Sequence, residues 1–174
     1  MNTRKKYILF FAIIIIGVAL DQFTKQLAVK YLQGPGIYDG DAFFSWAFAE
    51  NDGAFLSLGS SLPDGLRLIL LTIVPGILLV GVMIYMLRSK TAGVLENIVF
   101  ALISAGGIGN IIDRIMAGKV VDFMHMNYFG IAETGIFNVA DLYIVFGIIL
   151  YVIAYFINLR KQKAALAAAE DSAT

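Results

Sequence analysis

The chain has no cysteine, a single histidine and few charged residues, and each shortage removes a class of function. Without cysteine there is no disulfide, no thiolate nucleophile and no thiolate metal site. His125 alone cannot build a histidine-rich zinc or iron site, so we expect no bound metal and no other cofactor. The formal net charge is zero, and a chain without a basic excess is a poor partner for nucleic acid.

Apolar residues are what the chain has in abundance. They make up 59% of its 174 residues, charged residues make up 15%, and the mean hydropathy is +0.81. A soluble domain is about 45–50% apolar, so the excess must face lipid. A helix crosses the hydrocarbon core with about 20 mostly apolar residues. The sequence predicts an all-α integral membrane protein, a single membrane domain over residues 1–174, with transmembrane helices at about 7–28, 66–87, 94–112 and 140–159.

The basic residues indicate how the chain is oriented. Arg4–Lys6 before an apolar run is also typical of a cleaved signal peptide, but the apolar pattern continues to Val29, which favours an uncleaved anchor. Lysine and arginine gather in the short loops on the cytoplasmic side of a membrane. The denser basic set consists of Arg4, Lys5, Lys6, Arg88, Lys90, Arg160, Lys161 and Lys163. We therefore expect both termini in the cytoplasm and the loops 29–65 and 114–139 outside.

With this topology the unusual polar residues converge on the outer face. Ionisable groups within a membrane are costly and are functional candidates by default. The converging residues are Asp21, Lys25, Asn51, Asp52, Gly53, Asn110, Asp113, Arg114, Asp122, Asn138 and Asp141. The sequence therefore predicts a functional site at the outer membrane surface.

Several of these residues also have a purely structural interpretation. Asp21 and Lys25 are four residues apart on a helix, which is the spacing of an ion pair. Asn138 is suited to cap the fourth helix. For Asp113 we favour a carboxylate–guanidinium pair with Arg114 that orders the site.

Asp122 and Asp141 are harder to explain as structural residues. Asp122 lies among apolar neighbours in a segment that we expect to be a loop before the fourth helix. Burial raises the pKa of a carboxyl group, as does a second carboxylate nearby. Two aspartates that share one proton supply a base and an acid together. Such a pair can activate water against an amide.

The first outer loop contains a different pattern. Phe44, Trp46 and Phe48 alternate with small residues, which is typical of a strand. The segments 34–36 and 39–41 carry turn residues. We therefore expect a small extracytoplasmic β-type segment between the first and second helices, either as an aromatic anchor at the interface or as a platform for an extended substrate.

Five blocks of residues carry a resemblance to a known family. They are Asp21-Gln22-Phe23-Thr24-Lys25, Asn51-Asp52-Gly53-Ala54-Phe55, Gly106-Gly107-Ile108-Gly109-Asn110-Ile111-Ile112-Asp113-Arg114, Val120-Val121-Asp122-Phe123 and Phe137-Asn138-Val139-Ala140-Asp141. In their order and topology they resemble the lipoprotein signal peptidases, also called signal peptidase II, of bacterial membranes. The second helix and the C-terminal tail carry no such block.

The resemblance implies a membrane aspartic endopeptidase that removes the signal peptide from prolipoproteins, just before the diacylglyceryl-modified cysteine. The implied catalytic pair is Asp122 and Asp141. The implied supporting or substrate-binding residues are Asp21, Lys25, Asn51, Gly53, Asn110, Asp113, Arg114 and Asn138. The family is the target of the cyclic peptide globomycin. We expect a monomer in the bacterial cytoplasmic membrane, with the active site at the outer face and membrane lipids around it.

Three other functions compete with this one. A cation or proton transporter would use Asp21, Asp113 and Asp141, although these acids do not trace a path across the bilayer. A lipid-phosphate hydrolase would bind phosphate at Arg114 and a divalent metal at the aspartates. A Ser–Lys peptidase would pair Lys25 with Ser104, which lies about two turns deeper than the site.

Overall fold

The computed structural model describes residues 3–34, 42–53, 59–89 and 92–171. Within these ranges four helices are long and apolar enough to cross a membrane: Arg4–Leu32, Asp64–Arg88, Val94–Ala117 and Val139–Ala164. Each predicted span lies within one of these helices, and the helices extend up to a few residues beyond the predicted ends. The turn residues at 35–41, Ala54–Phe55 and Lys90 lie outside the described residues.

Three of the spans lie in continuous α-helices and the remaining one is interrupted. The continuous helices are α1 (Thr3–Leu32), α4 (Val94–Ala117) and α5 (Val139–Asp171). The second span consists of α2 (Asp64–Leu68), a π-helical turn η2 (Ile69–Ile73) and α3 (Val74–Arg88). Pro75 has no N–H for the carbonyl group of Leu71, and its ring crowds that carbonyl, so a distortion is expected at this place.

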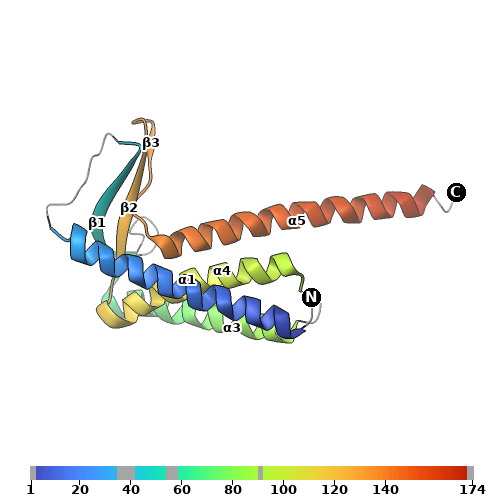
Figure 1. Ribbon diagram of the computed structural model, residues 1–174, viewed down its shortest axis with the longest axis horizontal. Helices are drawn as coiled ribbons and strands as arrows, with labels where there is room; N and C mark the ends of the chain where they lie inside the picture. The colour runs from blue at the N-terminus through green and yellow to red at the C-terminus, as the bar shows by residue number, and fades with distance from the viewer. Residues whose placement is uncertain (1–2, 35–41, 54–58, 90–91, 172–174) are drawn as a thin grey trace.

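Helix α4 is the centre of the bundle. It contacts α1, α3 and α5, and its buried face includes Ala101, Ala105, Gly106 and Gly109. These small residues let the neighbouring helices approach closely, as is common between helices in membranes. Figure 1 shows α1, α3 and α4 side by side, with α5 running past the end of the bundle.

Polar contacts tie the start of α1 to the connection between α3 and α4. The ammonium group of Lys6 donates a hydrogen bond to the carbonyl oxygen of Ser89 at 2.7 Å. The amide of Asn97 in turn donates to the carbonyl oxygen of Lys6 at 2.9 Å. The basic segments around Arg4 and Arg88 therefore share one end of the bundle.

A three-stranded antiparallel sheet lies at the other end of α1 (Figure 1). Its order is β1 (Phe44–Asn51), β2 (Val120–Tyr128) and β3 (Ala132–Glu133). The predicted strand is confirmed as β1, where Phe44 and Trp46 are exposed.

The expectation of a loop around Asp122 was wrong, because the residue lies within β2. Val120, Val121 and Phe123 have high strand propensity, and β1 supplies a partner for them. Asp122 pairs with Ala49 across the two strands. The carboxyl group therefore sits on a sheet that has a fixed register.

Candidate active site

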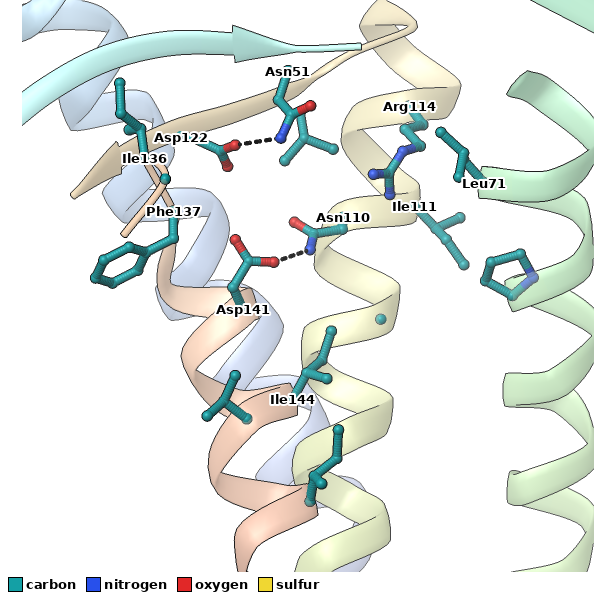
Figure 2. A pocket seen from close by; sticks show the side chains of 16 residues that line it. Asn51, Leu71, Asn110, Ile111, Arg114, Asp122, Ile136, Phe137, Asp141 and Ile144 are labelled. Atoms are coloured by element: carbon teal, nitrogen blue, oxygen red, sulfur yellow. Dashed lines mark hydrogen bonds between the residues drawn. The ribbon is translucent and has the colours of Figure 1, made fainter. Parts of the chain in front are cut away.

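A short connection brings Asp122 and Asp141 to the same place. Phe137 and Met124 exchange backbone hydrogen bonds of 2.8 and 2.9 Å, which hold the segment before α5 against β2. The next residue, Asn138, donates a hydrogen bond from Nδ2 to Oδ1 of Asp122 at 2.6 Å. Asp141 lies in the first turn of α5. Figure 2 shows the carboxylates of Asp122 and Asp141 pointing toward the same space.

Asn138 also caps helix α5, as predicted. Its side-chain oxygen accepts a hydrogen bond from the backbone N–H of Asp141 at 3.0 Å. Oδ2 of Asp141 accepts one from the backbone N–H of Asn138 at 3.1 Å. This reciprocal arrangement is a capping box with asparagine and aspartate. The structural and the functional interpretations of Asn138 are therefore compatible, because its other group bonds Asp122.

Two further amides complete the contacts of the carboxylates. Asn51 donates from Nδ2 to Oδ2 of Asp122 at 2.9 Å, and Asn110 donates from Nδ2 to Oδ1 of Asp141 at 2.8 Å (Figure 2). Asn110 also accepts a hydrogen bond from Asn138 at 3.1 Å. Each of the four carboxylate oxygens thus accepts one N–H donor. An oxygen with one donor keeps a lone pair for water or substrate.

Lys25 is the centre of a buried polar cluster behind Asn110. Its ammonium group lies 2.9 Å from Oδ2 of Asp21 and 2.9 Å from Oδ2 of Asp113. It also donates to Oδ1 of Asn110 at 2.9 Å. The Asp21–Lys25 pair expected from the helical spacing is confirmed. Since a buried charge is costly without partners, the three contacts explain how Lys25 is accommodated.

The predicted pair between Asp113 and Arg114 was wrong. Asp113 accepts hydrogen bonds from Gln22 at 2.8 Å and from the backbone of Val121 at 3.3 Å, besides its ion pair with Lys25. Consecutive residues on a helix point about 100° apart, so Arg114 faces elsewhere. Gln22 was not expected at the site, although it stands next to Asp21.

Asp21 joins α1 to the start of α5. Its Oδ1 accepts a hydrogen bond from the backbone N–H of Ala140 at 2.9 Å. That N–H belongs to the first turn of α5, where intrahelical partners are missing. Asp21 therefore holds the turn that carries Asp141.

Arg114 and Gly53 form the edge of the site toward the first outer loop. Nη2 of Arg114 donates to the carbonyl oxygen of Gly53 at 2.8 Å. The backbone N–H of Gly53 donates to Oδ1 of Asn51 at 2.9 Å, which orients the amide that bonds Asp122. Gly53 thus links a cationic side chain to one of the amide donors.

The two carboxylates open into a cavity of about 460 Å³ with mostly apolar walls. Asn51, Asn110, Arg114, Asp122 and Asp141 are its polar lining. The apolar lining comes from the second, third and fourth spans and the segment before α5, and it includes Leu71, Pro75, Ile111, Ile136, Phe137, Ile144, Val145 and Ile148. The sequence did not single out these apolar residues, because an apolar side chain in a transmembrane helix looks the same whether it faces lipid or a cavity.

Burial dominates the electrostatics of Asp122. The side chain is 2% exposed, and its pKa is raised from 3.8 to about 6. Desolvation is the main cause, and the charge of Asp141 adds to it. The hydrogen bonds from Asn51 and Asn138 act in the opposite direction, because they stabilise the ionised form. Asp122 therefore exchanges a proton near neutral pH, as expected from its apolar neighbours.

This balance leads to a testable titration. We expect the Asp122 carboxyl group to titrate at a pH of about 6, and at a higher pH in Asn51→Ala, which loses a donor to the ionised form. Infrared difference spectra between each protein and its Asp122→Asn derivative isolate this carboxyl band. A midpoint near 3.8, or a midpoint that Asn51→Ala does not raise, would contradict the assignment.

Comparison with known proteins places these features in a family. A model of the family described as signal peptidase (SPase) II matches residues 13–157. A lipoprotein signal peptidase of Pelodictyon phaeoclathratiforme is 40% identical over 148 residues, which cover 80% of this chain and 85% of that protein. One of Caldanaerobacter subterraneus is 42% identical over 142 residues, with 80% and 91% covered.

Solved structures agree with the sequence comparison. A bacterial membrane enzyme has a TM-score of 0.73 and 26% identity, and the match covers 86% of this chain and 88% of that one. Another bacterial membrane enzyme has a TM-score of 0.70 and 27% identity, with 84% and 91% covered. The fold described above therefore resembles that of solved bacterial membrane enzymes.

Proposed function

The chain belongs to the signal peptidase II family, and from this premise we propose that it removes the signal peptide from diacylglyceryl-modified prolipoproteins. The cut lies just before the lipidated cysteine, and water activated between Asp122 and Asp141 makes it. One observation carries the proposal: the two carboxylates come from different elements, share Asn138 as a partner and line one cavity. The chain is a membrane peptidase by its family; the aspartic mechanism is our inference from the site.

The proposed mechanism divides one proton between the two aspartates. Burial favours the protonated form of Asp122, so we assign it the proton that polarises the scissile carbonyl group. Asp141, ionised, takes a proton from water, and the hydroxide adds to the carbonyl carbon. The tetrahedral intermediate collapses when the leaving amine takes up that proton. The Arg114 guanidinium, on the same cavity wall, would stabilise the developing negative charge.

The remaining polar residues would keep the pair in place. Asn51, Asn110 and Asn138 donate directly to the carboxylates. Lys25 donates a hydrogen bond to Asn110, and Asp113 forms an ion pair with Lys25. Asp21 and Gly53 act through the backbone, at the start of α5 and at the Arg114 contact. We assign these seven positions, together with Arg114, to support and substrate binding.

The shape of the cavity suits a substrate that is largely apolar. Leu71 and Pro75 line it from the second membrane span, and Ile144, Val145 and Ile148 line it from the fourth. A signal segment and its neighbouring acyl chains could remain in an apolar environment while the peptide bond reaches the aspartates. Because one chain supplies every residue of the site, we propose a monomeric enzyme that works among membrane lipids.

We further propose that the protein lies in the bacterial cytoplasmic membrane with both termini inside and the aspartates at the outer face. The chain lacks cysteine, so single cysteines can be labelled cleanly. In intact cells a membrane-impermeant maleimide should label Tyr128→Cys, and it should label Arg88→Cys only after permeabilisation. The reverse pattern would overturn the orientation.

Inhibitors separate the proposed reaction from its main competitor. Purified protein in detergent should cleave a diacylated prolipoprotein at the same rate with and without EDTA, because no step of the aspartate mechanism uses a metal. Globomycin should block the reaction if the implied family behaviour holds here. Prolipoprotein cleavage that EDTA abolishes and added divalent metal restores would contradict the aspartate mechanism. Release of phosphate from lipids, without cleavage of the prolipoprotein, would favour the lipid-phosphate hydrolase.

A further inference from the structure

A second hollow adjoins the catalytic cavity. Its volume is about 330 Å³, and it shares Leu71 and Arg114 with the first cavity. Its lining contains a larger share of charged and polar residues than that of the first, with Asp52, Asp64, Arg67, Thr72 and Lys119 among them. The two hollows therefore meet at Arg114 and differ in chemistry on its two sides.

The charges around this second hollow are arranged in ion pairs. Arg67 lies 3.3 Å from Asp52 and also pairs with Asp64, and Lys119 pairs with Glu50. These pairs are partly open to solvent, since the Arg67 side chain is 24% exposed and Asp64 is 94% exposed. Among the lining residues there are three cations, Arg67, Arg114 and Lys119, against Asp52 and Asp64. Glu50 lies outside the lining but balances Lys119, so the cation left for a ligand is Arg114, which donates to the carbonyl oxygen of Gly53 and makes no ion pair among the described residues.

We propose that the second hollow binds the residues that directly follow the lipidated cysteine of the substrate, and that it favours acidic side chains there. This inference rests on the proposed function. A prolipoprotein is apolar on the signal side of the scissile bond and hydrophilic on the mature side. The first cavity suits the apolar part, and a polar hollow that continues from it beyond Arg114 suits the hydrophilic part. Its cations supply the preference for acidic residues.

Opposite charge changes in the hollow test this assignment. Three diacylated substrates would differ only at the first and second residues after the cysteine, with two Glu, two Gln or two Lys. For the wild-type protein we expect kcat/KM for the Glu substrate to exceed that for the Lys substrate about two- to fivefold, the range of a partly exposed ion pair. Arg67→Gln should reduce this ratio, and Asp64→Asn should increase it.

Two controls make the test specific. Arg88→Gln removes a cation at the other end of the bundle and should leave the Glu-to-Lys ratio unchanged. High salt should bring the wild-type ratio toward one, because it screens exposed charges. A structural defect would lower all three rates together and would not move the ratio in opposite directions for Arg67→Gln and Asp64→Asn.

Other results would overturn the inference. If both variants leave the ratio unchanged, or shift it in the same direction, the mature segment does not occupy the hollow. If the variants change only the response to added anionic phospholipid, the occupant is a lipid head group. If none of the three substrates is cleaved, the proposed function itself fails, and this inference fails with it.

Discussion

Asp122→Asn and Asp141→Asn should each reduce kcat for prolipoprotein cleavage by at least about a hundredfold, which is the lower range for loss of a general acid or base. Asparagine retains the size of aspartate and one oxygen acceptor. It cannot give up or take up the proton that the reaction moves. The addition of water and the collapse of the tetrahedral intermediate both need the aspartate pair. The double variant should therefore be little less active than either single variant. Single-turnover cleavage by purified protein measures the effect.

The matched control for this experiment is Glu133→Gln, which neutralises a carboxylate that is 68% exposed and lines neither hollow. With neutral residues after the cysteine it should retain nearly full activity. The thermal transition in detergent should show that Asp122→Asn and Asp141→Asn remain folded. Full activity of either catalytic variant would remove the aspartate pair from the mechanism.

Gly106→Ala should have the second largest effect, although it changes no polar group. A methyl group at Gly106 would overlap the carbonyl oxygen of Ala140 and lie 2.8 Å from Cγ1 of Ile144. The backbone of α5 would have to move at the turn that carries Asp141. Overpacking of this kind costs about 1–3 kcal/mol of stability. A displacement of about 1 Å at a reacting group can cost about a hundredfold in rate.

Gly81→Ala is the control for this substitution. Gly81 also lies in a membrane-spanning helix, but a methyl group there would meet nothing within 4 Å. The thermal transition and kcat should fall in Gly106→Ala and stay near wild type in Gly81→Ala. If Gly106→Ala keeps wild-type activity, the close approach of α4 and α5 does not position Asp141.

Much of this architecture was predictable, because the membrane imposes a strong constraint on sequence. A span needs a long apolar run, so the four spans were found within a few residues of their ends. The strand β1 was found because its exposed Phe44 and Trp46 alternate with buried small residues. Strand β2 was missed: its pattern is not alternating, since Val120, Asp122, Phe123 and Met124 are all buried.

The site was predictable in its residues and less so in its contacts. The polar residues were expected to lie together because burying each of them near lipid costs free energy. The structure does connect Asp21, Lys25, Asn110 and Asp141 through an ion pair and hydrogen bonds. Which partner each one takes depends on helix rotation, which hydropathy does not report. Asp113 therefore turned out to face Lys25 and not Arg114. The cavity walls depend on how α3 and α5 sit around α4, and no local pattern encodes that arrangement.

The most direct test of this account is to map by mass spectrometry where the purified protein cuts a diacylated prolipoprotein, with the unmodified precursor in parallel. We predict a single cut immediately before the lipidated cysteine by the wild-type protein, and no cut by Asp122→Asn or Asp141→Asn. No product from a folded wild-type sample, a cut at another bond, or the same product from either variant would contradict the assignment of Asp122 and Asp141 as the catalytic pair of a lipoprotein signal peptidase.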